Sequence, residues 1–198
     1  MPTNFSAGPN KLVPEVEVRL RDACEAFPDS DIASWSSSRR DPRVHDAFDR
    51  CVALVKDILH VPDDFEIIFT QGGATSLFKA WPLNICPTPC FVDVVRTGHW
   101  ANEAHRGLEE VAAGGVINLG TQFPGWEAVS YQTDWLGSFL YAVSNETVNG
   151  TQLRDWGILP HRTPSLIIDM SSDIMMQPIP FDRIGMLFAS TQKNLGMT

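Results

Sequence analysis

Short apolar runs alternate along the chain with longer segments in which apolar residues recur every three or four positions. The short runs, bounded by polar and glycine residues, are typical of strands buried on both faces of a parallel sheet. The longer segments are typical of helices with one apolar face. This alternation predicts an α/β fold with a largely parallel sheet. The predicted strands are residues 66–70, 91–95, 116–119, 139–143, 165–169 and 186–189.

The helical segments lie before and between these runs. One helix is predicted to begin at Pro14, a position where proline is tolerated, and to carry apolar residues as far as Phe27. The strongest helical pattern covers residues 44–59. Shorter helices are predicted over residues 77–81 and in the segment that follows Trp100. Each short helix follows a strand, as the crossover connections of a parallel sheet require.

Two charged residues follow strands near the end of the chain. Asp169 ends one predicted strand, and Lys193 comes shortly after the next one. In open α/β sheets, ligands bind outside the carboxyl ends of the strands, so both residues are predicted to face one crevice. A lysine and a carboxylate are the pair that pyridoxal 5'-phosphate (PLP) requires, for a Schiff base and for the pyridine nitrogen. The alternative is a helix-capping aspartate and a solvated lysine.

Other strand ends carry residues suited to an anion or a planar ring. Gly72 and Gly73 precede a predicted helix, where backbone amides and the Thr75 hydroxyl could bind phosphate. Trp100 follows another strand and could stack on a ring, or could equally be a core tryptophan. Thr147 places a hydroxyl after a third strand. The polar loop with Arg39 and Arg40 is either solvated or an anion clamp.

Composition and charge narrow the classes of partner. The chain has 198 residues, of which 43% are hydrophobic and 20% charged, which is enough for one sizeable core. Its net charge of -9, without clusters of basic residues, argues against nucleic acid or an anionic membrane as a partner. No apolar stretch approaches the length of a membrane span, and no signal-peptide pattern is present, so a cytoplasmic location is expected.

The four cysteines are predicted to be reduced. Cys24 and Cys51 fall on apolar helix faces and are expected in the core. Cys86 and Cys90 are separated by three residues and lack a second metal-ligand pair nearby, so no metal site is predicted. Free thiols fit a reducing compartment.

Several short motifs, taken together, resemble the phosphoserine aminotransferases, PLP-dependent enzymes of the class-V aminotransferase family. The resemblance implies the large domain of the PLP-dependent aminotransferase fold type I, a three-layer αβα arrangement. It also implies amino transfer between glutamate and 3-phosphohydroxypyruvate in L-serine biosynthesis, by a homodimer in the full-length form. The matching stretches are Asn4–Pro9, Gln71–Thr75, Phe78 with Pro82–Asn84, Thr97–Trp100, Asn145–Thr147, Asp169–Ser172 and Gln192–Gly196.

The resemblance also implies a role for each strand-end residue. Lys193 looks like the Schiff-base lysine, and Asp169 looks like the partner of the pyridine nitrogen. Trp100 looks like the residue that stacks on the cofactor ring, and Thr147 like the one that binds the ring hydroxyl. The residues that look like phosphate ligands are Ala74, Thr75 and Gln192.

The chain departs from the family pattern at three points. Arg39 stands where the family usually has a histidine, next to Arg40, which keeps a bidentate clamp for substrate anions. Thr75 stands where many members have arginine or serine. The chain is also about half as long as family members and ends five residues after Lys193, so it is expected to be a fragment.

The expected organisation is an N-terminal helical segment with a substrate loop over residues 1–62 and an incomplete PLP-binding large domain over residues 63–198. The C-terminal small domain is expected to be absent. Two alternatives stay open. One is a class-V PLP enzyme that uses a different oxo acid, and the other is a truncated PLP-fold domain without catalytic activity.

Overall fold

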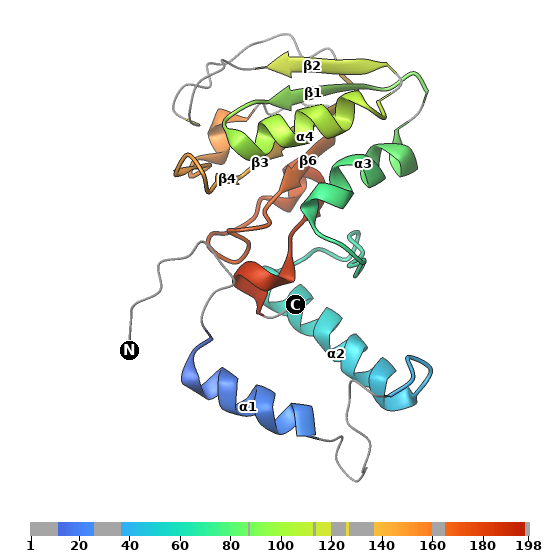
Figure 1. Ribbon diagram of the computed structural model, residues 1–198, viewed down its shortest axis with the longest axis vertical. Coiled ribbons are helices and arrows are strands. Elements are labelled where there is room, and N and C mark those ends of the chain that lie inside the picture. The colour runs from blue at the N-terminus through green and yellow to red at the C-terminus, as the bar shows by residue number, and fades with distance from the viewer. Residues whose placement is uncertain are drawn as a thin grey trace. The chain divides into compact units, whose positions relative to one another are not determined.

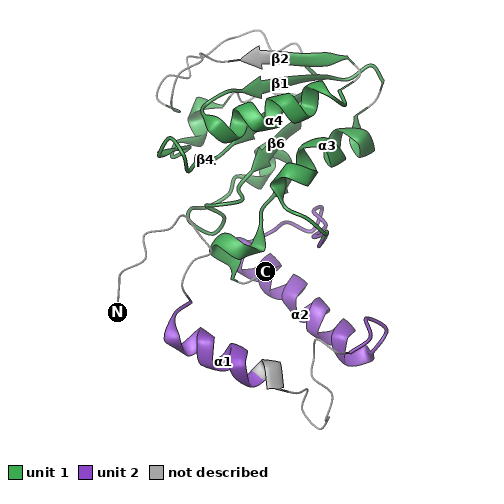
Figure 2. Cartoon of the chain, in the orientation of Figure 1, with its two compact units in different colours: residues 1–7, 70–198 green, residues 8–69 purple. Residues whose placement is uncertain are grey.

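The chain forms two compact units, one of residues 8–69 and one of residues 1–7 and 70–198 (Figure 2). The predicted loop at Asn4–Pro9, the side chain of Cys24, Phe27 and most of the segment 122–132 lie outside the described part of the chain. The computed structural model describes residues 12–25, 37–86, 88–112, 114–119, 126, 137–159 and 165–196.

A five-stranded parallel sheet forms the centre of the larger unit (Figure 1). Its strand order is β2-β1-β3-β6-β7, and every neighbouring pair is parallel. The α/β fold with a parallel sheet is therefore confirmed. The strands are β1 (Phe91–Val95), β2 (Gly115–Leu119), β3 (Phe139–Val143), β6 (Ser165–Asp169) and β7 (Ile184–Phe188).

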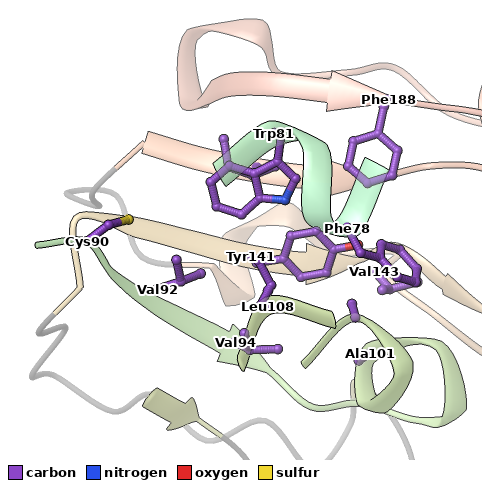
Figure 3. Packing of buried hydrophobic residues seen from close by; sticks show 12 residues of the cluster. Phe78, Trp81, Cys90, Val92, Val94, Ala101, Leu108, Tyr141, Val143 and Phe188 are labelled. Carbon is purple, nitrogen blue, oxygen red and sulfur yellow. The ribbon is translucent and has the colours of Figure 1, made fainter. Parts of the chain in front are cut away.

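Two helices and aromatic packing cover the sheet. Helix α3 (Ala74–Ile85) begins three residues before the predicted start and packs against α4 (His99–Glu109). Figure 3 shows the core between these helices and the strands, where Trp81 stacks on Tyr141 with ring centroids 6.3 Å apart. Phe78 meets the same tyrosine edge-on at 6.2 Å. The buried aromatic cluster holds α3 in place on the sheet, and with it the start of α3.

Short elements complete the larger unit. The antiparallel pair β4 (Asn145–Glu146) and β5 (Thr151–Gln152) directly follows β3, and Gly150 turns the chain between them with φ of 73°. Trp126 is buried and donates from Nε1 to the Val143 carbonyl over 3.2 Å. Three further turns are η3 (Trp156–Ile158), η4 (Phe181–Arg183) and η5 (Thr191–Leu195).

The smaller unit contains two helices, α1 (Pro14–Glu25) and α2 (Pro42–Leu59). Both predicted helices are confirmed. Asp41 caps α2, since its side chain accepts from the Arg43 backbone amide over 2.9 Å, and His60 ends the helix in the left-handed conformation. No residue of α2 is buried, although its apolar face makes one aromatic contact, between Phe48 and Phe69 at 5.1 Å. No helix in the described part of the chain is long and apolar enough to cross a membrane.

Three predictions from the sequence are wrong. Residues 66–70 form no strand, and Ile68 is 78% exposed, because no other described strand pairs with this apolar run. Cys51 is exposed on α2 rather than in a core. Cys86 and Cys90 form a disulfide instead of remaining free, because the end of α3 and the start of β1 bring their Cα atoms to 5.5 Å.

The packing of α4 gives a matched pair of leucine substitutions. Leu108 is fully buried between α4 and the sheet, so Leu108→Ala should lower the free energy of unfolding by about 2–5 kcal/mol. Leu83 lies on α3 and is 68% exposed, so Leu83→Ala should change it by about 0.5 kcal/mol or less. Urea unfolding of the two variants measures the difference, and equal losses would contradict the arrangement of the core.

Candidate functional site

Asp169 is a buried carboxylate at the carboxyl end of β6. It is in register with Val143 of β3 and Phe188 of β7, so it lies at the edge where three parallel strands end together. Its side chain is 3% exposed, and its Oδ1 accepts from the Ser171 amide over 2.8 Å. Burial raises the pKa of Asp169 to about 6, against the lowering effect of the Ser171 hydrogen bonds. The nearby Asp173 and Glu146 charges raise this pKa further.

Lys193 lies in the π-helical turn η5, just past β7, as predicted. The next residue, Asn194, donates from its side chain to the Ile174 carbonyl over 2.8 Å. Before the turn, the Ser190 hydroxyl lies 3.5 Å from the Ser171 hydroxyl. These two contacts tie the turn that carries Lys193 to the loop that follows Asp169, so the structure brings the two segments together.

The N-terminus of α3 lies beside the same turn. Gly73 precedes the helix, and no side chain caps the first amides of α3. A Cβ placed on Gly73 would lie 3.8 Å from the Ser190 hydroxyl, so the start of α3 closely approaches the end of β7. Ala74 and Thr75 are the first two helical residues, and an uncapped helix N-terminus favours an anion. Gln192 lies in η5, next to Lys193.

Trp100 and Thr147 meet at the start of α4. The Trp100 indole donates from Nε1 to the Thr147 hydroxyl over 2.8 Å. Trp100 is 36% exposed, whereas the core residue Trp81 is 2% exposed. Trp100 is therefore a rim residue, and the alternative of a core tryptophan is excluded.

A pocket of about 530 Å³ opens between α3 and α4. Thr75 and Trp100 both line it, so a predicted phosphate ligand and the predicted stacking residue share one hollow. The charged residues around it include two ion pairs, Lys79 with Glu110 and Arg106 with Glu103. The lining of the pocket thus includes an indole, a hydroxyl and paired charges.

Arg39 and Arg40 belong to the smaller unit and are exposed there. The Arg40 amide donates to the Ser38 hydroxyl over 3.2 Å, within a short turn before α2. The role of these two arginines in binding substrate stays a prediction.

Two buried carboxylates near Asp169, at the carboxyl end of the sheet, were missed by the sequence analysis. Asp173 is 1% exposed, binds the Ser144 hydroxyl, and accepts from Gln152 Nε2 over 3.0 Å. Glu146 is fully buried and accepts hydrogen bonds from the start of α4. Burial raises the pKa of both carboxyl groups. The only signal in the sequence is their position a few residues after strand ends, since their side-chain partners lie 21 to 49 residues away.

Comparisons with known proteins show the family of the chain and its fold. The profile of the Aminotransferase class-V family matches residues 3–198. A probable phosphoserine aminotransferase of Caenorhabditis elegans is 33% identical over 98% of this chain and 52% of its own length. The phosphoserine aminotransferase of Lysinibacillus sphaericus is 31% identical over 98% of this chain and 54% of its own.

Solved structures give the same result. PLP-bound phosphoserine aminotransferase from Trichomonas vaginalis matches with a TM-score of 0.84 and 28% identity, over 98% of this chain and 58% of its own. Phosphoserine aminotransferase from Bacillus circulans subsp. alkalophilus matches with a TM-score of 0.85 and 27% identity, over 98% of this chain and 54% of its own. The expected fold type is confirmed, and the chain spans about half the length of these relatives.

The raised pKa of Asp169 predicts how stability depends on pH. The folded state holds the Asp169 proton more tightly than the unfolded chain, in which the aspartate pKa is near 3.8. Below about pH 4 Asp169 therefore does not destabilise the fold. As the pH rises from about 4 to about 6, the destabilisation caused by Asp169 grows. Between these limits the protein without cofactor should lose about 3 kcal/mol relative to Asp169→Asn, because one pKa unit corresponds to about 1.4 kcal/mol.

Urea unfolding of both proteins from pH 4 to pH 7 measures this difference. Taking the difference between them reduces the contribution of Glu146 and Asp173, which are present in both proteins. Parallel curves for the two proteins would contradict a buried, ionisable Asp169.

Proposed function

The chain belongs to the class-V aminotransferase family, and from that premise we propose that it is part of a phosphoserine aminotransferase. The reaction is the transfer of an amino group between glutamate and 3-phosphohydroxypyruvate, in L-serine biosynthesis. The cofactor is pyridoxal 5'-phosphate. A cytoplasmic location and a homodimer of the full-length protein are parts of the same proposal. The observation that carries it is the meeting of Asp169, the Lys193 turn and the start of α3 at one end of the sheet.

The residues at this end of the sheet fit the cofactor chemically. An uncapped helix N-terminus suits a phosphate, and a buried carboxylate suits a protonated ring nitrogen. An exposed indole next to a hydroxyl suits a flat ring that carries its own hydroxyl. When bound, PLP acts as an electron sink for the carbanion at the substrate Cα.

The residues have the following proposed roles. Lys193 would hold the cofactor covalently and, when its amine is free, would act as the general base for the proton at the substrate Cα. Asp169 would keep the ring nitrogen protonated, and that positive charge would in turn favour the charged form of this carboxyl. Ala74, Thr75 and Gln192 would bind the phosphate. Trp100 would stack on the ring, and Thr147 would bind its hydroxyl.

Arg39 and Arg40 are proposed to bind the anionic groups of the substrate. A guanidinium forms paired hydrogen bonds with a carboxylate or a phosphate. Arg39 carries a permanent charge where the family usually has histidine, which favours a substrate with more than one anionic group. This feature supports a phosphorylated oxo acid over an unphosphorylated one.

The role of Lys193 can be tested by chemical labelling. The chain is incubated with PLP, reduced with borohydride and mapped by peptide mass spectrometry. We expect the reduced cofactor on Lys193, an absorbance band that disappears in Lys193→Ala, and no loss of either in Lys56→Ala, which changes a lysine of α2. Label spread over several lysines, or turnover retained by Lys193→Ala, would contradict the assignment. Specific labelling without turnover would favour a truncated domain that binds the cofactor but does not catalyse.

The substrate can be tested with two acceptors and two arginine variants. We expect amino transfer from glutamate to be faster with 3-phosphohydroxypyruvate than with its unphosphorylated analogue. Arg40→Ala should raise the KM for the phosphorylated acceptor by roughly 10- to 100-fold, because a hydrogen bond to a charged group contributes about 1.5–3 kcal/mol. The control is Arg50→Ala, an exposed arginine of α2, which should leave the KM unchanged. Equal rates with both acceptors would favour a class-V enzyme with another oxo acid.

A further inference from the structure

Glu146 is a fully buried carboxylate that binds the first turn of α4. Its Oε2 accepts from the Trp100 amide over 2.7 Å, and its Oε1 accepts from the Ala101 amide over 2.8 Å. The Thr97 hydroxyl lies 3.5 Å from the same Oε1. Glu146 belongs to β4, which lies beside α4 (Figure 1). The usual capping position of this helix is Gly98, which has no side chain, so Glu146, which is 45 and 46 positions after the two amides, satisfies them instead.

The segment that contains Glu146 binds Trp100 both at its backbone amide and at its indole nitrogen. Glu146 binds the Trp100 backbone, and the next residue, Thr147, binds its indole nitrogen. Asn149 adds a third contact, since its Oδ1 accepts from the His99 amide over 2.9 Å. A tryptophan fixed at its amide and at its indole nitrogen has little freedom to change its ring plane.

The approach between the two segments is close. A Cβ on Gly98 would lie 2.8 Å from Glu146 Cγ and 2.5 Å from Asn149 Oδ1, distances that real side chains do not show. The absence of a side chain at Gly98 is what lets the carboxylate reach the helix amides. The position also has a favourable field, because a negative charge at a helix N-terminus meets the positive end of the helix dipole.

We propose that Glu146 is a positioning residue for the cofactor site, which fixes the ring plane of Trp100 by capping α4 from β4. Glu146 itself touches neither cofactor nor substrate in this proposal and acts through Trp100. The inference rests on the proposed function for what Trp100 stacks on. The capping itself is independent of that function and can be measured without cofactor.

The first experiment measures amide hydrogen exchange in the protein without PLP. In Glu146→Ala the Trp100 and Ala101 amides should exchange at least roughly tenfold faster, because their buried acceptor is gone. Glu146→Gln keeps the length and one carbonyl acceptor but turns an NH₂ group toward the second amide, so only one of the two should lose protection. Asn149→Ala is the matched control. It removes an exposed cap of the same helix and should affect only the His99 amide. Unchanged exchange at Trp100 and Ala101 in both Glu146 variants would overturn the proposal.

The second experiment reads the position of the indole toward the cofactor. Binding of PLP should quench part of the tryptophan fluorescence. The quenching that is seen in the unchanged chain but not in Trp100→Phe is the quenching of Trp100. In Glu146→Gln that part should fall by at least roughly half, while far-ultraviolet circular dichroism and borohydride labelling of Lys193 remain. Asn149→Ala should keep the full quenching. Full quenching by Trp100 in the Glu146 variants would overturn the proposal.

The two experiments separate failure of this inference from failure of the proposed function. If Lys193 is not labelled even in the unchanged chain, the proposed function fails, and the exchange rates still decide whether Glu146 holds α4. If Lys193 is labelled and the quenching of Trp100 is the same in the Glu146 variants as in the unchanged chain, the proposed function stands and the positioning role is wrong.

Discussion

The parallel pairing of β3, β6 and β7 is the constraint on which the site depends. Val143, Asp169 and Phe188 occupy matching positions in three neighbouring strands, so the chain leaves the sheet three times at one edge. The segments after these strands therefore lie close in space, although Thr147, Ser171 and Lys193 are far apart in sequence. A shift of one residue in the pairing would turn Asp169 toward the opposite face of the sheet. The buried aromatic cluster beneath α3 supports this register by filling the space between helix and strands.

Three buried carboxylates at this edge would destabilise the fold if they had no hydrogen-bond donors. Asp173 binds the Ser144 hydroxyl and the Gln152 amide, and Glu146 binds two helix amides. Asp169 has the Ser171 amide, and its pKa is raised to about 6. All three carboxyl groups accept hydrogen bonds, and burial still raises the pKa of each, so Asp169 favours a positive partner. A protonated ring nitrogen is such a partner, and the free energy of burial then favours binding of the cofactor.

The sequence predicts the sheet well because its central strands are short apolar runs with polar residues at their ends. It also places Asp169, Lys193 and Trp100 correctly at strand ends, since that inference needs only strand direction. It fails for residues 66–70, because an apolar run becomes a strand only when a partner strand pairs with it. It fails for Cys86 and Cys90, whose bond depends on how α3 ends. Glu146 was missed because its contact with Trp100 spans 46 residues, and no local pattern indicates a cap supplied from so far away.

Two residues of the Asn145–Thr147 stretch, Glu146 and Thr147, act together on Trp100. Thr147 is proposed to bind the cofactor ring, yet in the protein alone its hydroxyl accepts from the Trp100 indole. Glu146 accepts from the backbone amides of Trp100 and Ala101 at the start of α4. Two neighbouring side chains thus hold the backbone and the ring of the same tryptophan. If the ring stacks on the cofactor, then one face of the cofactor site is set by β4 before any cofactor binds, which lowers the entropy lost on binding.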